Sequence, residues 1–455
     1  MTSQPSTKFD AHEPVAEVRG ISPQKYFQLV VLVFALNLFS ASLFIAFINS
    51  PVYDDEYNIV DVHNYAQHGL TAASLRAHAN APGPASYIWM ATVVRVLHGN
   101  ELRDARIGSA LSWVLLVCGT LAFVRYGAHS QEWCAAMLVL LVFPHAVEAT
   151  ATVLTEGPAL LFAVLGAIAW IEFSASENAT PDSIALGLLG GLSIGIAVTA
   201  RQYYLALLPA AAVLAIWETR LSVPRRPWLW KIGAVVSMAL AAVPILLLVT
   251  IWKGATSPEM ATGVSYTNWQ VKLGVNFFRP LTALIYCLIY LLPLTFPLML
   301  PINLSRRWRE IGVAILAGLA AARFHAQALQ PGPLRSAFYA IAHGPVLTAV
   351  MFGLLVAIAA FSAIIIARTL WAKRAELLTR PAVVFAVLMV LFFIGEQFGV
   401  GGNGPFYDRY ILQIAPFLGI ISFAALPQLS YERLGMLGAM SVLNHVILWR
   451  YAFAS

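Results

Sequence analysis

Charged residues are scarce in this sequence, and their scarcity excludes whole classes of protein. Asp, Glu, Lys and Arg make up 11% of the 455 residues, whereas hydrophobic residues make up 59%. Soluble domains carry about 25% charged residues, so a soluble globular protein is excluded. The apolar runs reach the length of about 20 residues that a membrane-spanning helix needs, whereas barrels use alternating segments of about 10 residues. The sequence therefore predicts an all-α, polytopic membrane helical bundle.

Cysteine is also rare, and the few cysteines lie in apolar surroundings. Cys118, Cys134 and Cys287 all fall within apolar runs, a placement that indicates neither a disulfide framework nor a metal site. The polar residues 1–25 precede an apolar run that lacks a cleavage pattern, so this run is expected to be a retained anchor. The net charge of +6 is explained by basic cytoplasmic loops, and no signature of nucleic-acid binding is present.

The spacing of the basic segments predicts the sidedness of the chain. Three connectors rich in Lys and Arg lie at 220–231, 306–309 and 368–380, with two apolar runs between each connector and the next. An even number of crossings places all three on one side, and the positive-inside tendency makes that side cytoplasmic. Residues 1–25 are expected there as a tail, and residues 26–455 as a single transmembrane catalytic domain.

Whether residues 84–98 cross the membrane decides if the number of crossings before the first basic connector is even or odd. Six clear apolar runs lie between the tail and the first basic connector. The segment 84–98 would be a seventh, but it is short for a bilayer that needs about 20 residues, and it carries Arg95. We therefore expect an interfacial helix and not a crossing. Residues 50–104 then form one long extracytoplasmic loop with interfacial helices, and the whole chain has about 13 transmembrane helices. The runs at 311–330 and 434–451 are the least regular of these.

Three consecutive carboxylates, Asp54, Asp55 and Glu56, follow the first apolar run. Ionisable groups at the edge of a membrane are functional candidates, and the alternative is a solvated acidic turn that ends a helix. The predicted topology brings further polar residues to the same face, namely His63, Glu156, Arg201, Gln202, Tyr203, Lys272, Arg409 and Tyr410.

Acids mixed with Arg, Lys and Tyr at one membrane surface suit a phosphate-bearing ligand whose tail lies in lipid. A carboxylate can accept the proton of an acceptor hydroxyl, and Arg or Lys can hold a departing phosphate. Displacement of a polyprenyl phosphate from a sugar needs these two parts.

Each candidate has a structural alternative. Glu156 stands before Gly157-Pro158, where an acid can simply favour a helix N-terminus. Arg201 can be a snorkelling interfacial residue, and Arg409 can pair with its neighbour Asp408. Lys272 can be an ordinary loop charge. His63 lies two helical turns after Glu56, so both can meet one metal ion or His63 can be solvated.

The order of these residues resembles the GT-C superfamily of integral membrane glycosyltransferases. It is most similar to the branch of protein O-mannosyltransferases and the aminoarabinose transferase of lipid A. The residues that carry the resemblance are Asp55-Glu56 with Tyr57 and Tyr65, the proline-rich Pro82-Gly83-Pro84, Arg103 or Arg106 at the start of the second span, Glu156, and Arg409-Tyr410. Arg201-Gln202 is similar to the Arg-Gln of the dolichyl-phosphate-glucose branch. The second-loop acid is Glu where many relatives have Asp, and the sequence has no sizeable soluble C-terminal domain, which argues against an oligosaccharyltransferase.

The resemblance implies an inverting transfer from a polyprenyl-phosphate-linked sugar at the extracytoplasmic face. It implies a bacterial inner membrane enzyme whose acceptor is a glycan, a lipid or a protein. By the resemblance, Asp55 is the base and Glu56 its neighbour. From the residue chemistry we further expect Glu156 as a catalytic residue, and Arg201, Arg409 and Lys272 on the donor phosphate. Asp54, Gln202, Tyr203 and Tyr410 are expected on the substrate, and Glu56, His63 and Glu156 on a divalent cation, if one binds.

Two other functions remain open from the sequence. A transporter or lipid flippase would use the same acids as a cation or proton relay, but it should carry ionisable residues near mid-membrane on broken helices. A polymerase or ligase that joins preassembled lipid-linked glycans would need a similar polar face.

Overall fold

The fold of this chain is entirely helical in the part that the structure describes. The computed structural model describes residues 23–52, 54–126, 130–221, 226–262, 276, 278–299, 307–329, 333–399, 406–426 and 430–454, and it contains no strand among them. The long helices are α1 (Pro23–Phe47), α5 (Glu101–Tyr126), α6 (Ser130–Val142), α8 (Glu156–Ala175), α9 (Pro181–Ala200), α10 (Leu207–Leu221), α11 (Trp228–Trp252), α14 (Phe278–Thr295), α15 (Trp308–Arg323), α18 (Pro345–Ala372), α20 (Pro381–Glu396), α21 (Ala415–Ala425) and α22 (Tyr431–Ala454).

Short helices connect the long ones. They are α2 (Asp55–His68), α3 (Ala72–Arg76), α4 (Pro84–Leu97), α7 (Ala146–Ala151), η1 (Gln202–Ala206), α12 (Pro258–Thr262), η2 (Phe296–Met299), α16 (His325–Ala328), α17 (Pro333–Ala342), α19 (Arg374–Leu377) and η4 (Asp408–Ile414).

The prediction of a polytopic membrane bundle is confirmed. Among the described residues, seven helices are long and apolar enough to cross a membrane, namely α1, α5, α8, α9, α11, α14 and α18. Three shorter apolar helices lie at α6, α20 and α21. Most of the apolar runs that the sequence predicts to span are helical where the structure describes them, but the run 132–149 is broken between α6 and α7, and α15 ends at Arg323 within the run 311–330. The total of about 13 crossings stays a prediction.

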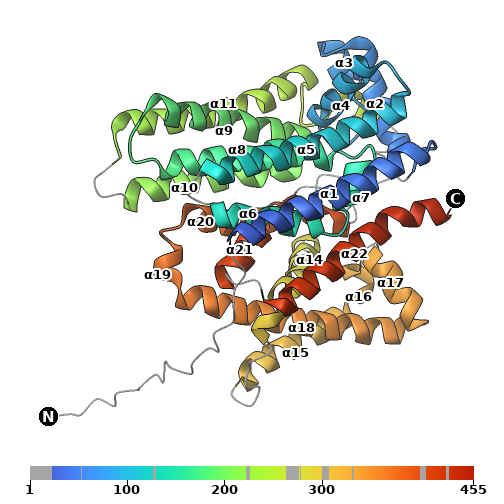
Figure 1. The fold of residues 1–455 in the computed structure, drawn as a ribbon, viewed down its shortest axis with the longest axis vertical. Helices are drawn as coiled ribbons and strands as arrows, with labels where there is room; N and C mark the ends of the chain where they lie inside the picture. The colour runs from blue at the N-terminus through green and yellow to red at the C-terminus, as the bar shows by residue number, and fades with distance from the viewer. Residues whose placement is uncertain are drawn as a thin grey trace.

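The bundle has two distinct ends. The long helices run roughly side by side, with α2, α3, α4, α16, α17 and the C-terminus at one end and α19 at the other (Figure 1). Helix α4 has 14 residues, about 21 Å at the helical rise, which is less than the ~30 Å of a bilayer core. It lies beside α2 and α3, as an interfacial helix of the first loop would. We call the end with α2, α3 and α4 the outer end and the opposite one the inner end.

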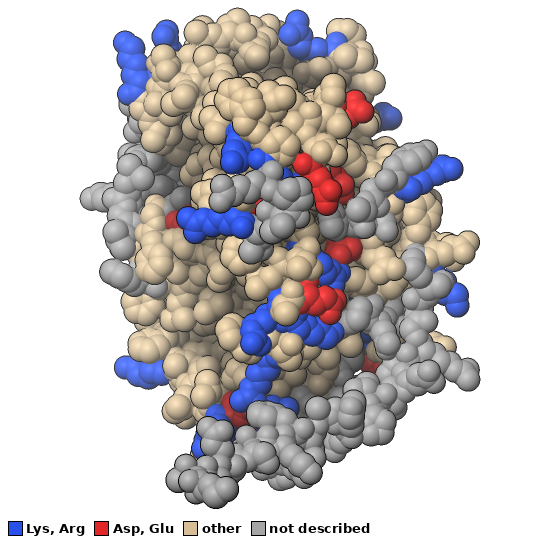
Figure 2. Space-filling view, turned by 90° about the vertical axis from the view of Figure 1, so that its left-hand side faces the viewer, with Lys and Arg blue, Asp and Glu red and all other residues tan. Residues whose placement is uncertain are grey.

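Lys and Arg side chains gather at the inner end (Figure 2). Some of these side chains form hydrogen bonds and ion pairs within the protein. Arg226 donates to the backbone carbonyls of Ser174 and Ser176 and pairs with Glu218 at 3.0 Å. Arg380 pairs with Glu132 at 2.5 Å. The described residues of the three basic connectors lie at one end of the bundle, as their spacing predicts (Figure 1).

Helices α9 and α11 approach each other at small residues. A Cβ atom built on Gly191 would lie 2.1 Å from the carbonyl oxygen of Ser237, so only glycine permits this backbone contact. Small residues at such crossings allow the close packing that holds helices together within lipid. Because Arg201 directly follows the last residue of α9, this contact helps to position a candidate site residue.

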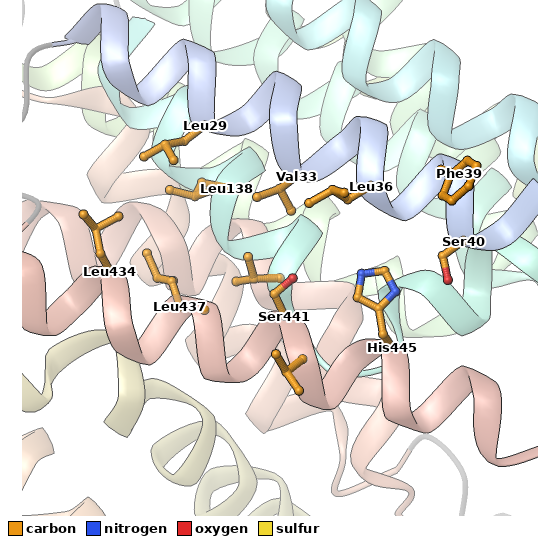
Figure 3. Close-up of a pocket in the computed structure, with 13 residues that line it drawn as sticks. Leu29, Val33, Leu36, Phe39, Ser40, Leu138, Leu434, Leu437, Ser441 and His445 are labelled. Carbon is orange, nitrogen blue, oxygen red and sulfur yellow. The ribbon is translucent and has the colours of Figure 1, made fainter.

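An apolar groove runs between the first and last long helices. It has a cavity volume of about 510 Å³ and is lined by α1, α6 and α22, with Ser441 and His445 as polar residues among Leu and Val side chains (Figure 3). The bond from Trp449 Nε1 to Ser40 Oγ, 2.9 Å long, joins α22 to α1 near this groove. Asp54, Glu156, Arg201 and Arg409 are not among the residues that line this groove.

The α9–α11 contact predicts a large effect of a single methyl group. We expect Gly191→Ala to lower the free energy of unfolding by roughly 1–3 kcal/mol, because the added atom overpacks the interface. Gly435→Ala on α22 is the matched control, since a Cβ there meets nothing within 4 Å. Thermal unfolding in detergent measures both; equal melting temperatures for the two variants would contradict the packing described.

Candidate active site

The candidate site lies where the ends of several elements meet at the outer end. Asp54 immediately precedes α2, Glu156 is the first residue of α8, and Arg201 follows the last residue of α9. Arg279 lies in the first turn of α14, and Arg409 is the second residue of η4. The side chains of these five residues form the charged cluster described below, so segments far apart in the sequence contribute to one site.

A chain of ion pairs connects four of these residues. Arg201 Nη2 lies 2.5 Å from Glu156 Oε1, and Arg409 Nε lies 3.8 Å from the same oxygen. Arg409 Nη2 lies 2.7 Å from Asp54 Oδ2. Glu156 and Arg201 are buried, whereas the Asp54 side chain keeps 31% of its exposure. Two acids and two arginines predicted from the sequence are therefore in direct contact, and Arg409 contacts Asp54 and Glu156.

Two tyrosines form an aromatic wall beside the arginines. The rings of Tyr203 and Tyr410 lie 4.8 Å apart. Arg201 Cζ is 5.5 Å from the Tyr410 ring centroid and 6.0 Å from that of Tyr203. Cation–π contacts of this kind hold a guanidinium in place without neutralising its charge. The arginines thus keep positive charge available for an anionic ligand.

Arg279 is a third arginine of the site, which the sequence analysis missed. Its Nη2 donates to Tyr203 Oη at 2.7 Å, its Nε donates to Gln397 Oε1 at 3.1 Å, and only 3% of it is exposed. Tyr203 therefore lies between Arg201 and Arg279. The available signal was an Arg immediately before an apolar run, on the face that carries the other candidates.

Asp55 is placed differently from Asp54. It is completely buried, and Arg106 Nη2 lies 2.6 Å from its Oδ2. The backbone N–H of Val153 donates to Oδ1 at 2.6 Å, and that of Val52 donates to Oδ2 at 3.1 Å. Both oxygens of Asp55 therefore already accept hydrogen bonds from the protein. Burial raises the pKa of Asp55, and Arg106 offsets part of that rise.

The Asp55–Arg106 pair fastens the first outer loop to the rest of the bundle. Arg106 also donates to the carbonyls of Ile48 and Ser50 at the end of α1. Asp55 and Arg106 thereby join α1, α2, α5 and the segment before α8. Of the two arginines that the resemblance offers at the start of the second span, Arg106 pairs with Asp55, whereas Arg103 is exposed.

A second buried pair shapes the turn that precedes α4. His78 Nδ1 lies 3.3 Å from Asp61 Oδ2, and the backbone N–H groups of Ala79 and Asn80 donate to Asp61. Gln202 Nε2 donates to the carbonyl of Ala81 at 2.6 Å. Gln202 therefore contacts the proline-rich turn of the first loop and joins that loop to the Arg201 side of the site.

The proposed cation ligands do not come together. Glu56 is exposed at the start of α2, and His63 Nδ1 lies 3.0 Å from Glu101. Glu156 is engaged by Arg201 and Arg409, whose charge opposes the binding of a cation. In the described ranges, no group of three His, Cys, Asp or Glu side chains is arranged to hold a metal ion. Among the described residues, Glu56, His63 and Glu156 are therefore not grouped as ligands of one metal ion.

Lys272 lies outside the described residues. Tyr407, in contrast, lies beside the ion-pair chain, with its ring centroid 5.4 Å from Arg409 Cζ. Burial raises the pKa of Tyr407 to about 12, so its hydroxyl stays protonated at neutral pH and can donate a hydrogen bond.

The arrangement brings arginine and carboxylate side chains together at the helix ends. Glu156 Oε2 and Arg201 Nε are buried and have no hydrogen-bond partner among the described residues. Buried polar atoms normally have partners, so these two atoms are left unsatisfied within the cluster. The charged groups suit a phosphate ester, and Asp54 is the acid that combines contact with the cluster and access to solvent.

Comparison with solved structures finds matches to two proteins at low sequence identity. The crystal structure of ArnT from Cupriavidus metallidurans in the apo state is 15% identical, with 93% of this chain and 78% of that chain covered and a TM-score of 0.40. The structure of the same protein bound to undecaprenyl phosphate is also 15% identical, with 94% of this chain and 77% of that chain covered and a TM-score of 0.41. The Archaeoglobus fulgidus oligosaccharyltransferase tethered with an acceptor peptide is 12% identical, with 84% of this chain and 56% of that chain covered and a TM-score of 0.36.

The sequence comparison is more specific. No curated protein matches this chain, but residues 83–254 match the family model described as dolichyl-phosphate-mannose-protein mannosyltransferase. That segment includes α4, Arg106, Glu156 and Arg201-Gln202, four of the features from which the resemblance was drawn. The match supports a glycosyltransferase, and over residues 83–254 it confirms the resemblance to the GT-C superfamily of integral membrane glycosyltransferases.

Proposed function

We propose that this chain transfers a sugar from a polyprenyl-phosphate-linked donor to an acceptor hydroxyl at the outer end of the bundle. The observation that carries the proposal is the cluster in which Arg201, Arg279 and Arg409 lie beside Tyr203 and Tyr410, and in which Arg201 and Arg409 also contact Glu156 and Asp54. On the predicted topology the outer end faces the extracytoplasmic side, the periplasm of a bacterial inner membrane.

The arginines are the donor-phosphate site in this proposal. A guanidinium binds phosphate in a bidentate manner and keeps its charge at every physiological pH. Arg201 and Arg279 flank Tyr203, and Arg409 is adjacent through Glu156. The site lies at the ends of membrane helices, so a phosphate bound there can leave its polyprenyl chain in the lipid. The buried, low-dielectric surroundings strengthen the attraction between guanidinium and phosphate.

Asp54 is the group that we assign as general base. It is partly exposed and 2.7 Å from Arg409, so binding of the donor phosphate to Arg409 would release its carboxylate for the acceptor hydroxyl. The resemblance gives this role to Asp55, but both oxygens of Asp55 are engaged by Arg106 and backbone N–H groups. We therefore assign Asp55 the role of holding Asp54 in position through the Arg106 anchor.

The reaction is a single displacement at the anomeric carbon. Asp54 accepts the proton of the acceptor hydroxyl, and the oxygen forms a new bond to the anomeric carbon from the side opposite to the phosphate. The bond between that carbon and the phosphate oxygen breaks, and polyprenyl phosphate leaves with the electron pair. The arginines stabilise the charge that develops on the leaving phosphate. One displacement inverts the configuration at the anomeric carbon.

The same site distinguishes the proposal from transport. In the described residues, the charged cluster lies at the ends of α8, α9, α14 and η4, whereas a transporter is expected to bind its ion near mid-membrane on broken helices. Incubation of the purified protein with a panel of polyprenyl-phosphate sugars and candidate acceptors tests the proposal. Acceptor-dependent release of polyprenyl phosphate supports glycosyl transfer, and its absence with every donor would count against it. Transfer that requires a preassembled lipid-linked glycan would indicate a polymerase or ligase.

The two neighbouring aspartates should respond differently to substitution. We expect Asp54→Asn to reduce turnover by at least about 10²-fold, the scale of general-base catalysis, with a melting temperature close to that of the unchanged protein. We expect Asp55→Asn to destabilise the protein by about 3 kcal/mol, because it leaves the buried Arg106 without a counter-charge. Turnover and thermal unfolding measured on both variants separate the roles. An inactive Asp55→Asn protein of normal stability beside an active Asp54→Asn protein would reverse the assignment.

Arg279 should matter for donor binding more than for folding. Loss of a hydrogen bond to a charged group costs roughly 1.5–3 kcal/mol, so we expect Arg279→Gln to weaken the binding of polyprenyl phosphate by about 10- to 100-fold. Titration of the purified protein with polyprenyl phosphate measures this effect. Arg103→Gln, which removes an exposed charge from the first turn of α5, serves as the control. Equal affinity for the two variants would exclude Arg279 from the phosphate site.

A further inference from the structure

The inner end of the α15–α18 pair carries two exposed tryptophans. Trp308 is the first residue of α15 and is 67% exposed, and Trp371 lies in the last turn of α18 and is 69% exposed. The two helices pack closely, since a Cβ on Gly318 would lie 2.5 Å from the carbonyl oxygen of Gly353. An ion pair between Arg368 and Glu310 joins their inner ends. Both tryptophans therefore belong to one local surface.

Each tryptophan carries an arginine on its ring. Arg309 Cζ is 5.1 Å from the ring centroid of Trp308, and Arg374 Cζ is 4.8 Å from that of Trp371. Arg374 Nη1 also donates to the carbonyl of Trp371 at 3.0 Å. Among the residues that the structure describes, no carboxylate lies within ion-pair distance of Arg309 or Arg374. Stacking on the rings thus fixes two cations that the protein itself does not neutralise.

The rest of this surface is also positive. Arg307, Arg368 and Lys373 join Arg309 and Arg374, and Glu310 is the acid that contacts them, 3.3 Å from Arg307. Other arginines at the same end form ion pairs within the protein: Arg226 pairs with Glu218, and Arg380 pairs with Glu132. Arg309 and Arg374 differ from these paired arginines, because they stack on tryptophan rings and no ion pair is found for them among the described residues.

We propose that the inner end of α15 and α18 binds the phosphate headgroup of an anionic phospholipid. Tryptophan prefers the interface between headgroups and acyl chains, which places Trp308 and Trp371 at the depth of lipid phosphates. Arg309 and Arg374, held on those rings, supply the cations that an anionic headgroup needs, and basic pockets between membrane helices on this side of a membrane bind such lipids. Exposed apolar side chains such as Leu316 and Leu354 continue along the same two helices and would contact the acyl chains.

This lipid site is independent of the proposed glycosyl transfer. It lies at the end of the bundle opposite to Asp54 and Arg201, so a failure of either proposal leaves the other intact. The partner is a membrane lipid rather than a soluble phosphate, because the exposed rings and the apolar faces of the helices offer contacts that only a lipid with acyl chains can use.

Lipid selectivity in reconstituted bilayers tests the proposal. The full chain is placed in bilayers of phosphatidylcholine that contain trace spin-labelled phosphatidylglycerol or spin-labelled phosphatidylcholine, and the motionally restricted fraction of each label is measured. We expect the unchanged protein to prefer phosphatidylglycerol, and Arg309→Gln/Arg374→Gln to lose that preference by roughly tenfold. The double variant Arg220→Gln/Lys231→Gln, which removes two exposed charges from α10 and α11 at the same end, should keep it.

Each other outcome would overturn the proposal. An equal loss in the two double variants would mean that the face attracts anionic lipid through its total charge, and no loss in Arg309→Gln/Arg374→Gln would exclude these arginines. Release of the labelled lipid by excess inorganic phosphate would indicate a simple anion site. Thermal unfolding of both double variants confirms that the substituted side chains, all exposed, leave the fold intact.

Discussion

The whole outer site depends on keeping arginine side chains charged among the ends of membrane helices. An unpaired charge in such surroundings is costly, so each guanidinium must find a carboxylate or an aromatic ring. Glu156 meets this need by lying 2.5 Å from Arg201 and 3.8 Å from Arg409. Glu156 and Asp54 contact Arg201 and Arg409, while Arg279 donates to Tyr203 and Gln397. These contacts stabilise the arginines when the site is empty, and the guanidinium groups can still attract an anion.

The scaffold explains how residues distant in sequence reach this cluster. Small residues such as Gly191 bring α9 against α11 and so determine where Arg201 stands. The Asp55–Arg106 pair fastens the first loop to the ends of α1 and α5 and leaves Asp54 facing Arg409. In this account adjacent acids have separate tasks: Asp55 anchors the loop from a fully buried position, while Asp54 remains accessible for chemistry.

Sequence reasoning was sufficient for features that depend on local pattern and on charge. Apolar run length predicted the helices, the basic connectors predicted which helix ends lie together, and the polar residues Glu156, Arg201 and Arg409 were placed on one face. It was insufficient where long-range packing decides. Arg103 and Arg106 are equivalent by spacing, and only their orientation on α5 shows that Arg106 meets Asp55. Arg279 was missed because nothing in its own segment shows that Tyr203 and Gln397, far away in the chain, receive its hydrogen bonds.

The central claim, that the outer cluster recognises the phosphate of a polyprenyl lipid, is tested most directly by a comparison of two ligands. Equilibrium binding of polyprenyl phosphate and of the uncharged polyprenol of the same length is measured on the purified, unmodified protein. The account predicts strong preference for the phosphate, at least tenfold, which high salt weakens only in part because the cations are buried. Equal affinity for the two lipids would show that the arginines do not hold a phosphate and would contradict the account.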